Sequence, residues 1–82
     1  MTRHRYIPGR FEVLSTGDVN TRQEFETYDD AKDWAAYLRK HWRDTGAWQV
    51  RIFDEDRLMR AWARDADTNK WSDSTKWANP IR

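Results

Sequence analysis

Hydrophobic residues recur at helical spacing in one long segment, between residues 28 and 44. Successive apolar positions there are three or four residues apart, which places them on one face of a helix: Tyr28, Ala31, Ala35, Leu38 and Trp42. Thr27 stands where an N-cap belongs, acidic residues fill the first turn and basic residues fill the last. Gly46 follows as a left-handed terminator. The pattern predicts one α-helix over residues 28–44.

Upstream of this helix, the segment RFEVLSTGDVNTRQEFET at 10–27 has the pattern of two strands around a turn. The run STGDVN supplies the turn residues, and we expect Gly17 to take a positive φ there. Across this first hairpin Phe11 should face Phe25, with Val13 on the same side. The other side would then carry three glutamates: Glu12, Glu24 and Glu26.

Downstream of the helix, WQVRIFDEDRLMRAWAR at 48–64 predicts a second hairpin. With DEDR as the connecting loop, Phe53 lies opposite Leu58 and Ile52 opposite Met59. One side becomes wholly apolar, as a sheet that packs on a helix requires: Trp48, Val50, Ile52, Met59, Ala61 and Ala63. The other side carries Gln49, Arg51, Phe53, Leu58, Arg60, Trp62 and Arg64. A slip of one residue would mix the two sets, which favours this register.

Together these elements predict a single α+β domain: a four-stranded antiparallel sheet (ββαββ) with one helix packed on one face. The strand order stays open, because the fourth strand could flank the first or lie at the far edge. We expect residues 1–9 to form a flexible basic arm and residues 10–65 to form the core. The polar tail 66–82 is either a short fifth strand or an irregular segment, with Trp71 and Trp77 at the core margin.

Composition narrows the class of protein. Eighty-two residues form one domain, and the net charge of +1 gives no strong long-range field. The absence of cysteine excludes disulfides, thiolate metal sites and thiol nucleophiles. No apolar run approaches the roughly 20 residues of a membrane span, and the N-terminus has no apolar signal core. We therefore expect a soluble, cytoplasmic protein without membrane contact.

The sequence offers little for catalysis. Its two histidines, His4 and His41, have no zinc-ligand spacing around them. The acidic runs DEDR and DDAKD have the composition of a turn and a helix start, and the three glycines are isolated from one another. We predict no enzyme, no metal and no cofactor.

The leading candidate site is the outer side of the second hairpin. Its proposed partner-binding residues are Arg51, Phe53, Leu58, Arg60, Trp62 and Arg64. Arg51 and Arg60 would be cross-strand neighbours, and like charges in such positions need compensation. Either a partner supplies it, or the glutamates on the outer side of the first hairpin form exposed ion pairs with these arginines. An apolar cluster rimmed by charge is typical of a docking surface. We therefore expect an interaction protein that binds and modulates a host or viral protein, for example as an inhibitor.

Two alternatives use the same face. A nucleic-acid-binding accessory module would stack bases on Trp62 and Phe53, and basic residues of the N-terminal arm would follow the phosphates: Arg3, Arg5 and Arg10. Steep salt dependence would distinguish that module from a protein-binding one. Self-association through the exposed aromatic residues would instead turn a monomer into a weak homodimer.

RQEFETYDDAKDWAAYLRKHW followed by WQVRIFDEDRLMRAW, within residues 22–64, resembles a layout that recurs in small uncharacterised bacterial and phage proteins. In that layout a Phe-x-Thr strand end caps a helix, and a hairpin with an acidic turn follows. The resemblance implies the same strand and helix order and a phage or prophage origin, but no functional residues. A fainter likeness is to the sheet-plus-helix modules of phage integrases, which dock a sheet on DNA and carry more basic residues on it.

Overall fold

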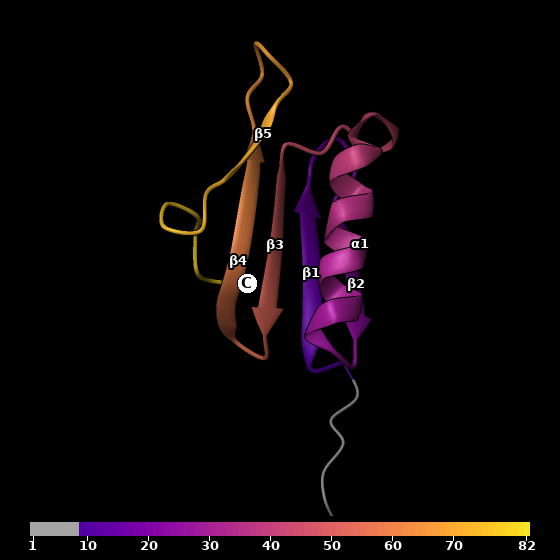
Figure 1. Cartoon of the computed structure of the whole chain (residues 1–82), viewed down its shortest axis with the longest axis vertical. Coiled ribbons are helices and arrows are strands. Elements are labelled where there is room, and N and C mark those ends of the chain that lie inside the picture. Colours follow the sequence, from indigo (N-terminus) through magenta and orange to yellow (C-terminus); the bar gives the residue numbers. More distant parts are fainter. Residues whose placement is uncertain (1–8) are drawn as a thin grey trace, which may run out of the picture.

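The computed structural model describes residues 9–82 and shows an α+β domain with one helix and an antiparallel sheet of five strands (Figure 1). The predicted class is confirmed, and of the two alternatives for the tail the short fifth strand is present. The strands are β1 (Phe11–Thr16), β2 (Thr21–Phe25), β3 (Gln49–Asp54), β4 (Arg57–Arg64) and β5 (Trp71–Asp73), and the helix is α1 (Tyr28–Lys40). Within residues 9–82, no helix is both long and apolar enough to span a membrane.

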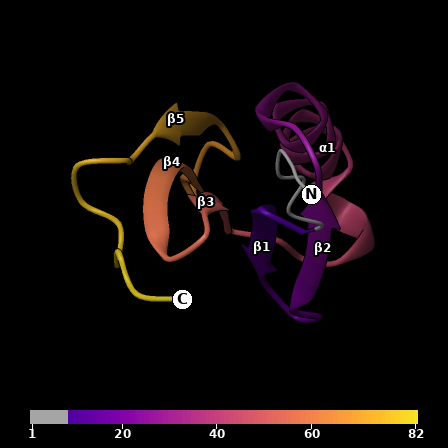
Figure 2. The same ribbon diagram turned by 90° about the horizontal axis from the view of Figure 1, so that it is seen from below.

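The order of strands in the sheet is β2-β1-β3-β4-β5, and each neighbouring pair is antiparallel. The fourth strand therefore lies beside the third, away from the first. Helix α1 packs on β1, β2 and β3, whereas β4 and β5 lie beside it (Figures 1 and 2). On its own face of the sheet, the helix thus covers β2, β1 and β3 but not β4 and β5. The part of that face over β4 and β5 is available to form a site.

Helix α1 begins as predicted and ends earlier than predicted. The Thr27 hydroxyl accepts a hydrogen bond of 3.1 Å from the backbone N–H of Asp30, as an N-cap does. The helix stops at Lys40, and a short 3₁₀ helix follows at Trp42–Asp44. Gly46 has a φ of +68°, so its left-handed conformation is confirmed, but it closes the turn into β3 rather than the α-helix itself.

The first hairpin has the predicted pairing, with Phe11 opposite Phe25 and Glu12 opposite Glu24. The predicted positive φ of Gly17 was wrong, because its φ lies outside the left-handed region. A Cβ at this position would lie 2.6 Å from the carbonyl oxygen of Gly46 and 2.7 Å from the Cα of Ala47. Gly17 therefore permits two backbone segments to touch.

The second hairpin departs from the predicted register. Phe53 pairs with Leu58 as expected, but Ile52 pairs with Arg60 because the register shifts between these two positions. A β-bulge of this kind opposes two residues to one, so Met59 is the extra residue. Beyond it every β4 side chain changes face, and Val50 consequently pairs with Trp62.

This shift adds the bulkiest side chain of β4 to the core. Trp62 is 7% exposed, and the buried cluster consists of Val13, Ala31, Ala35, Leu38, Val50, Ile52 and Trp62. Burial of an indole stabilises the fold far more than burial of the alanine that the predicted register placed inside. Trp71 packs against this cluster as predicted, whereas Trp77 is 84% exposed, so its placement at the core margin was wrong.

The other face of the sheet is not open. After β5 the chain crosses the sheet edge, and Figure 2 shows its C-terminal end on the side opposite α1. The Thr75 hydroxyl accepts a 3.0 Å hydrogen bond from the Ala61 N–H, and Arg51 donates to the carbonyls of Asn79 and Ile81. Phe53, which lies on this face, is 0% exposed.

An ion pair joins the start of β1 to the end of β3. Arg10 donates to both carboxylate oxygens of Asp54, at 2.8 and 3.0 Å, and Arg57 lies 3.9 Å away. The hydrogen bond from Arg10, together with the attraction of both cations, lowers the pKa of Asp54 from its ordinary value of 3.8.

We therefore expect a pH-dependent contribution to stability. A depressed carboxyl pKa stabilises the fold above about pH 4, and this stabilisation is lost as the pH falls through the lowered value. Urea unfolding between neutral and acid pH should show a shallower pH dependence in Asp54→Asn than in the wild type. Asp33→Asn, which removes one exposed helix carboxylate outside this ion pair, is the control. Equal slopes in all three proteins would contradict the expectation.

Candidate functional site

The six residues predicted to share one exposed face lie on two faces. Arg60, Trp62 and Arg64 lie on the helix side of β4, whereas Arg51, Phe53 and Leu58 lie on the side that the C-terminal segment covers. The single patch predicted from the sequence was therefore wrong, and the bulge at Met59 is the reason. The six residues therefore belong to two separate surfaces, three to each.

Arg51 and Arg60 are not the cross-strand neighbours that the sequence predicted, because they pair with Ala61 and Ile52. Of the two alternatives for their compensation, the ladder of ion pairs with the glutamates is not formed in the described part of the chain. Glu12 and Glu24 both bind Arg22, while Arg60 lies 2.9 Å from Asp73. Arg51 has only backbone carbonyls as its hydrogen-bond partners within the described residues.

The predicted nucleic-acid arm is only partly described. Its residue Arg10 is engaged by Asp54. Arg3 and Arg5 lie outside the described residues.

Arginines and tryptophans gather where the end of α1 meets β4. We call the group Arg39, Trp42, Arg43, Arg60, Trp62 and Arg64 the Arg–Trp surface. The guanidinium carbons of Arg39 and Arg60 lie 4.0 and 5.0 Å from the centre of the Trp62 ring. Those of Arg64 and Arg43 lie 3.7 and 4.5 Å from the centre of the Trp42 ring. Each indole thus carries two cations, an arrangement in which the ring quadrupole attracts both of them.

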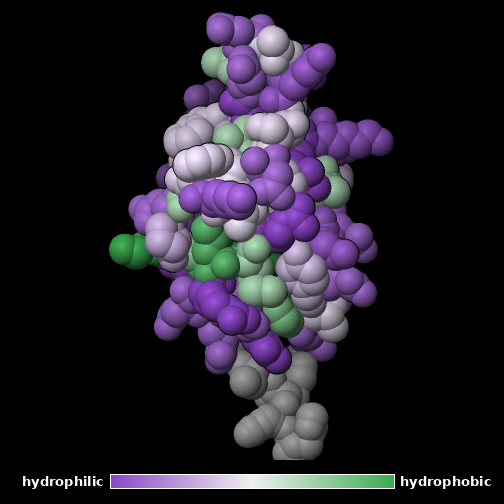
Figure 3. Space-filling view, turned by 60° about the vertical axis from the view of Figure 1, so that its left-hand side comes forward, coloured by the Kyte–Doolittle hydropathy of each residue, from purple (hydrophilic) through white to green (hydrophobic). Residues whose placement is uncertain are grey.

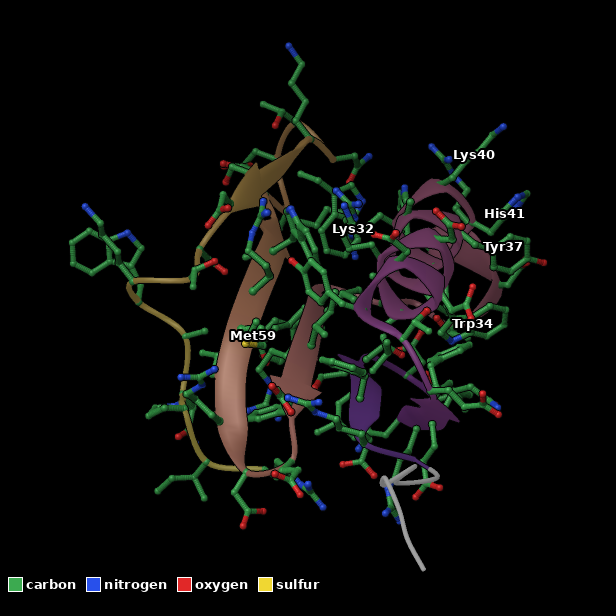
Figure 4. The ribbon with its side chains drawn as sticks, turned by 60° about the horizontal axis from the view of Figure 1, so that its bottom comes forward. Lys32, Trp34, Tyr37, Lys40, His41 and Met59 are labelled. Atoms are coloured by element: carbon green, nitrogen blue, oxygen red, sulfur yellow. The ribbon has the colours of Figure 1, made fainter. Side chains whose placement is uncertain are left out.

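Two kinds of periodicity bring these side chains together. Alternate residues of β4 point to one side of the sheet, which aligns Arg60, Trp62 and Arg64 along the strand. Arg39 is seven residues after Lys32 and so occupies the same flank of α1. In Figure 4, Lys32 lies on the β4 side of the helix, with Met59 facing it from β4.

The opposite flank of the helix is aromatic. Trp34, Tyr37 and His41 lie on the side away from β4 in Figure 4, with Trp34 stacked on Tyr37 at 5.0 Å between ring centres. Tyr37 in turn contacts the His41 ring at 4.4 Å. The helix thus separates a basic flank from an aromatic one, and only the basic flank borders β4.

Sequence reasoning missed half of the Arg–Trp surface. Arg39 and Arg43 were explained as partners of the helix dipole, and Trp42 was explained as a core position. The contact of the helix end with β4 is tertiary, so no local pattern shows it. The only available signal was the i, i+4 spacing of Arg39 and Arg43, which places two cations on one flank.

Carboxylates neutralise little of this surface. Arg60 is paired with Asp73, but Arg39, Arg43 and Arg64 have no carboxylate oxygen of residues 9–82 within 4.0 Å. Burial, together with repulsion by Arg60, lowers the pKa of Arg39. Arg64 donates instead to the Ala47 carbonyl and the Asn69 side chain, each at 2.9 Å. The site therefore holds positive charge that the described part of the chain does not compensate.

The chemistry of the site follows from these contacts. Stacking on an indole limits the motion of a guanidinium and leaves its N–H edge available for forked hydrogen bonds to carboxylates or phosphates. Because guanidiniums already cover the two indoles, bases cannot stack on those ring faces in this arrangement. The space-filling view of the β4 and β5 side of the molecule shows a small hydrophobic patch among hydrophilic residues (Figure 3). Residues 9–82 contain no group of His, Asp or Glu that could hold a metal ion.

The fold and the site define an α+β domain in which one helix covers part of an antiparallel five-stranded sheet and borders a basic, tryptophan-rich surface. Comparisons with protein-family models, with curated proteins and with solved structures found no match to this chain. The resemblance to small bacterial and phage proteins therefore stays a prediction.

Proposed function

We propose that this protein is a non-enzymatic interaction domain that binds an acidic segment of another protein on the Arg–Trp surface. One observation supports this most directly: Arg39, Arg43 and Arg64 contact indoles or backbone and lie near no carboxylate of the described chain. Carboxylates of a partner would supply the missing countercharge through forked hydrogen bonds. The origin of the chain and the identity of the partner stay predictions.

Most other arginines of residues 9–82 differ from these three. Five other arginines lie within ion-pair distance of a carboxylate: Arg10, Arg22, Arg57, Arg60 and Arg82. Three of the four described arginines without a carboxylate partner are thus gathered around the end of α1, and the fourth, Arg51, lies on the other face of the sheet. A cluster of this kind fixes the orientation of a partner more than it contributes raw affinity.

A protein partner fits better than a nucleic acid. The first half of α1 carries exposed carboxylates, among them Asp29, Asp30 and Asp33, close to the basic surface along the same helix. A long phosphate backbone leaving the arginines in that direction would meet these acids, whereas a short acidic peptide would not. The net charge of +1 and the covered indole faces also favour a protein partner over a nucleic acid.

Charge reversal tests the proposal. We expect an oligoglutamate peptide to bind the wild type at low salt, as followed by tryptophan fluorescence. The variant Arg39→Glu/Arg64→Glu should bind it at least about tenfold more weakly, because two charge-assisted hydrogen-bond donors are replaced by like charges. The matched control is Arg57→Glu/Lys76→Glu, which makes the same charge change at exposed positions away from the Arg–Trp surface.

Two outcomes would contradict this proposal. One is an equal loss of binding in the control variant, with both variants folded by circular dichroism. The other is binding of duplex or single-stranded DNA that is tighter than peptide binding, falls steeply with salt and needs the same two arginines. That second result would favour the nucleic-acid-binding module instead.

A further inference from the structure

A second surface lies on the side of the sheet opposite α1, where the C-terminal segment crosses it. We call the side chains Glu12, Arg51, Phe53, Leu58 and Ala61 the tail face, and residues 75–82 the tail. After Ser74, which donates to the Ala61 carbonyl at 2.8 Å, no backbone N–H or carbonyl of the described tail pairs with the backbone of a strand. Every described hydrogen bond between the tail and the rest of the domain beyond that point therefore involves a side chain on at least one side.

Arg51 makes the central contact with the tail. Its Nη1 donates to the carbonyls of Asn79 and Ile81, at 2.8 and 2.9 Å. Pro80 lies between these two residues and has no N–H, so the tail cannot form a regular strand ladder there. Main-chain carbonyls are common to every peptide, so this contact recognises an extended chain whatever its side chains are.

The guanidinium of Arg82 makes the second contact of the tail with the sheet. Arg82 Nε lies 3.1 Å from the carboxylate of Glu12, which is 2% exposed, and its Nη1 lies 3.5 Å from Asp56. Nη1 also donates to the Glu55 carbonyl. Glu12 of the tail face, together with Asp56 and the Glu55 carbonyl of the adjoining β3–β4 turn, thus binds one guanidinium. This arrangement favours a basic side chain at that position of the bound segment.

The apolar part of the tail is poorly matched to the surface beneath it. Trp77 and Ile81 are 84% and 71% exposed, although Phe53 under the tail is 0% exposed. An open pocket of about 910 Å³ is lined by tail residues such as Lys76 and Pro80 and by Leu58 and the β3–β4 turn. The two large apolar side chains of the tail therefore contribute little hydrophobic burial to its docking, and the apolar contribution comes from the sheet side chains that the tail covers. The space over Leu58 would accept an apolar side chain that the tail does not supply.

We propose that the tail face is a peptide-binding site that the tail occupies in cis. When the tail is displaced, the site binds an extended peptide of another chain that carries an arginine or lysine next to an apolar residue. Arg51 would hold two of its carbonyls, Glu12 and Asp56 its cation, and Leu58 its apolar side chain. This site lies on the opposite face of the sheet from the Arg–Trp surface and prefers the opposite charge, so it stands apart from the proposed function.

The full chain allows a direct test with the probe peptide TKWANPIR, which has the sequence of residues 75–82. Arg82→Glu should release the tail, because a carboxylate would face Glu12 and Asp56, while every residue of the tail face is kept. Fluorescently labelled peptide should then bind this variant at least about tenfold more tightly than the wild type, whose own tail competes at high effective concentration. Lys40→Glu is the matched control, since it makes the same charge change at an exposed position of α1, on the other side of the sheet from the tail.

Two further measurements make the result specific. Adding Arg51→Ala to Arg82→Glu should remove peptide binding, and the probe TKWANPIE should not bind either variant. Should Arg82→Glu prove unfolded by circular dichroism, the wild type still tests the site: excess TKWANPIR should speed amide hydrogen exchange in residues 75–82 while the sheet stays protected. No binding to folded Arg82→Glu, equal binding of the two probes, or an unchanged tail under excess peptide would each overturn the inference.

Discussion

Replacing Phe53 with alanine is expected to lower the free energy of unfolding by about 3 kcal/mol, as large truncations in protein cores do. Phe53 is 0% exposed because the tail covers the face of the sheet on which it lies. A loss of that size is a large fraction of the stability of a small domain. Urea unfolding followed by circular dichroism measures it.

The result also decides between two arrangements of the hairpin. On an open face, as the sequence pattern suggested, Phe53→Ala would change stability by only about 0.5 kcal/mol. Ile81→Ala is the control, since Ile81 is 71% exposed in the tail that covers Phe53. If both substitutions have the same small effect, the tail does not cover Phe53 in solution.

Gly17→Ala should destabilise the protein by about 2 kcal/mol. The added Cβ would lie 2.6–2.7 Å from backbone atoms of Gly46 and Ala47, which cannot move aside as a flexible side chain does. The β1–β2 turn or the start of β3 must shift instead, and forced shifts of this kind cost about 1–3 kcal/mol.

A neighbouring substitution separates this effect from a general sensitivity of the turn. Val19 is 56% exposed in the same turn, so Val19→Ala should leave the denaturation midpoint nearly unchanged. A Gly17→Ala protein as stable as the wild type would show that the two backbone segments do not touch.

Local patterns predicted the elements that depend on neighbouring residues. The apolar spacing in Tyr28–Lys40 and the Thr27 cap located the start of α1, because both act within one helical turn. The pairing of Phe11 with Phe25 followed from strand alternation around a short turn. The same reasoning predicted that Phe53 faces Leu58.

The candidate sites were not predictable in the same way. Alternation of apolar and polar residues assumes an unbroken ladder, and the extra residue Met59 breaks it. From that point Arg60, Trp62 and Arg64 change sides, so the six predicted residues are divided between two surfaces. The partners of Arg39 and Arg51 are more than 20 residues away along the chain, at Trp62 and at Asn79, and no periodicity links such positions.

The amino-acid sequence by itself determined that this chain forms an α+β domain with one amphipathic helix between two hairpins, because spacing and turn chemistry act locally. Tertiary structure alone decided which face each β4 side chain occupies, which arginines lack a carboxylate, and that the tail covers Phe53. A bulge is settled by the total burial of both faces of the sheet, and an ion pair by contacts between distant segments. The burial of the two faces and the contacts between distant segments are both defined only when the chain has folded.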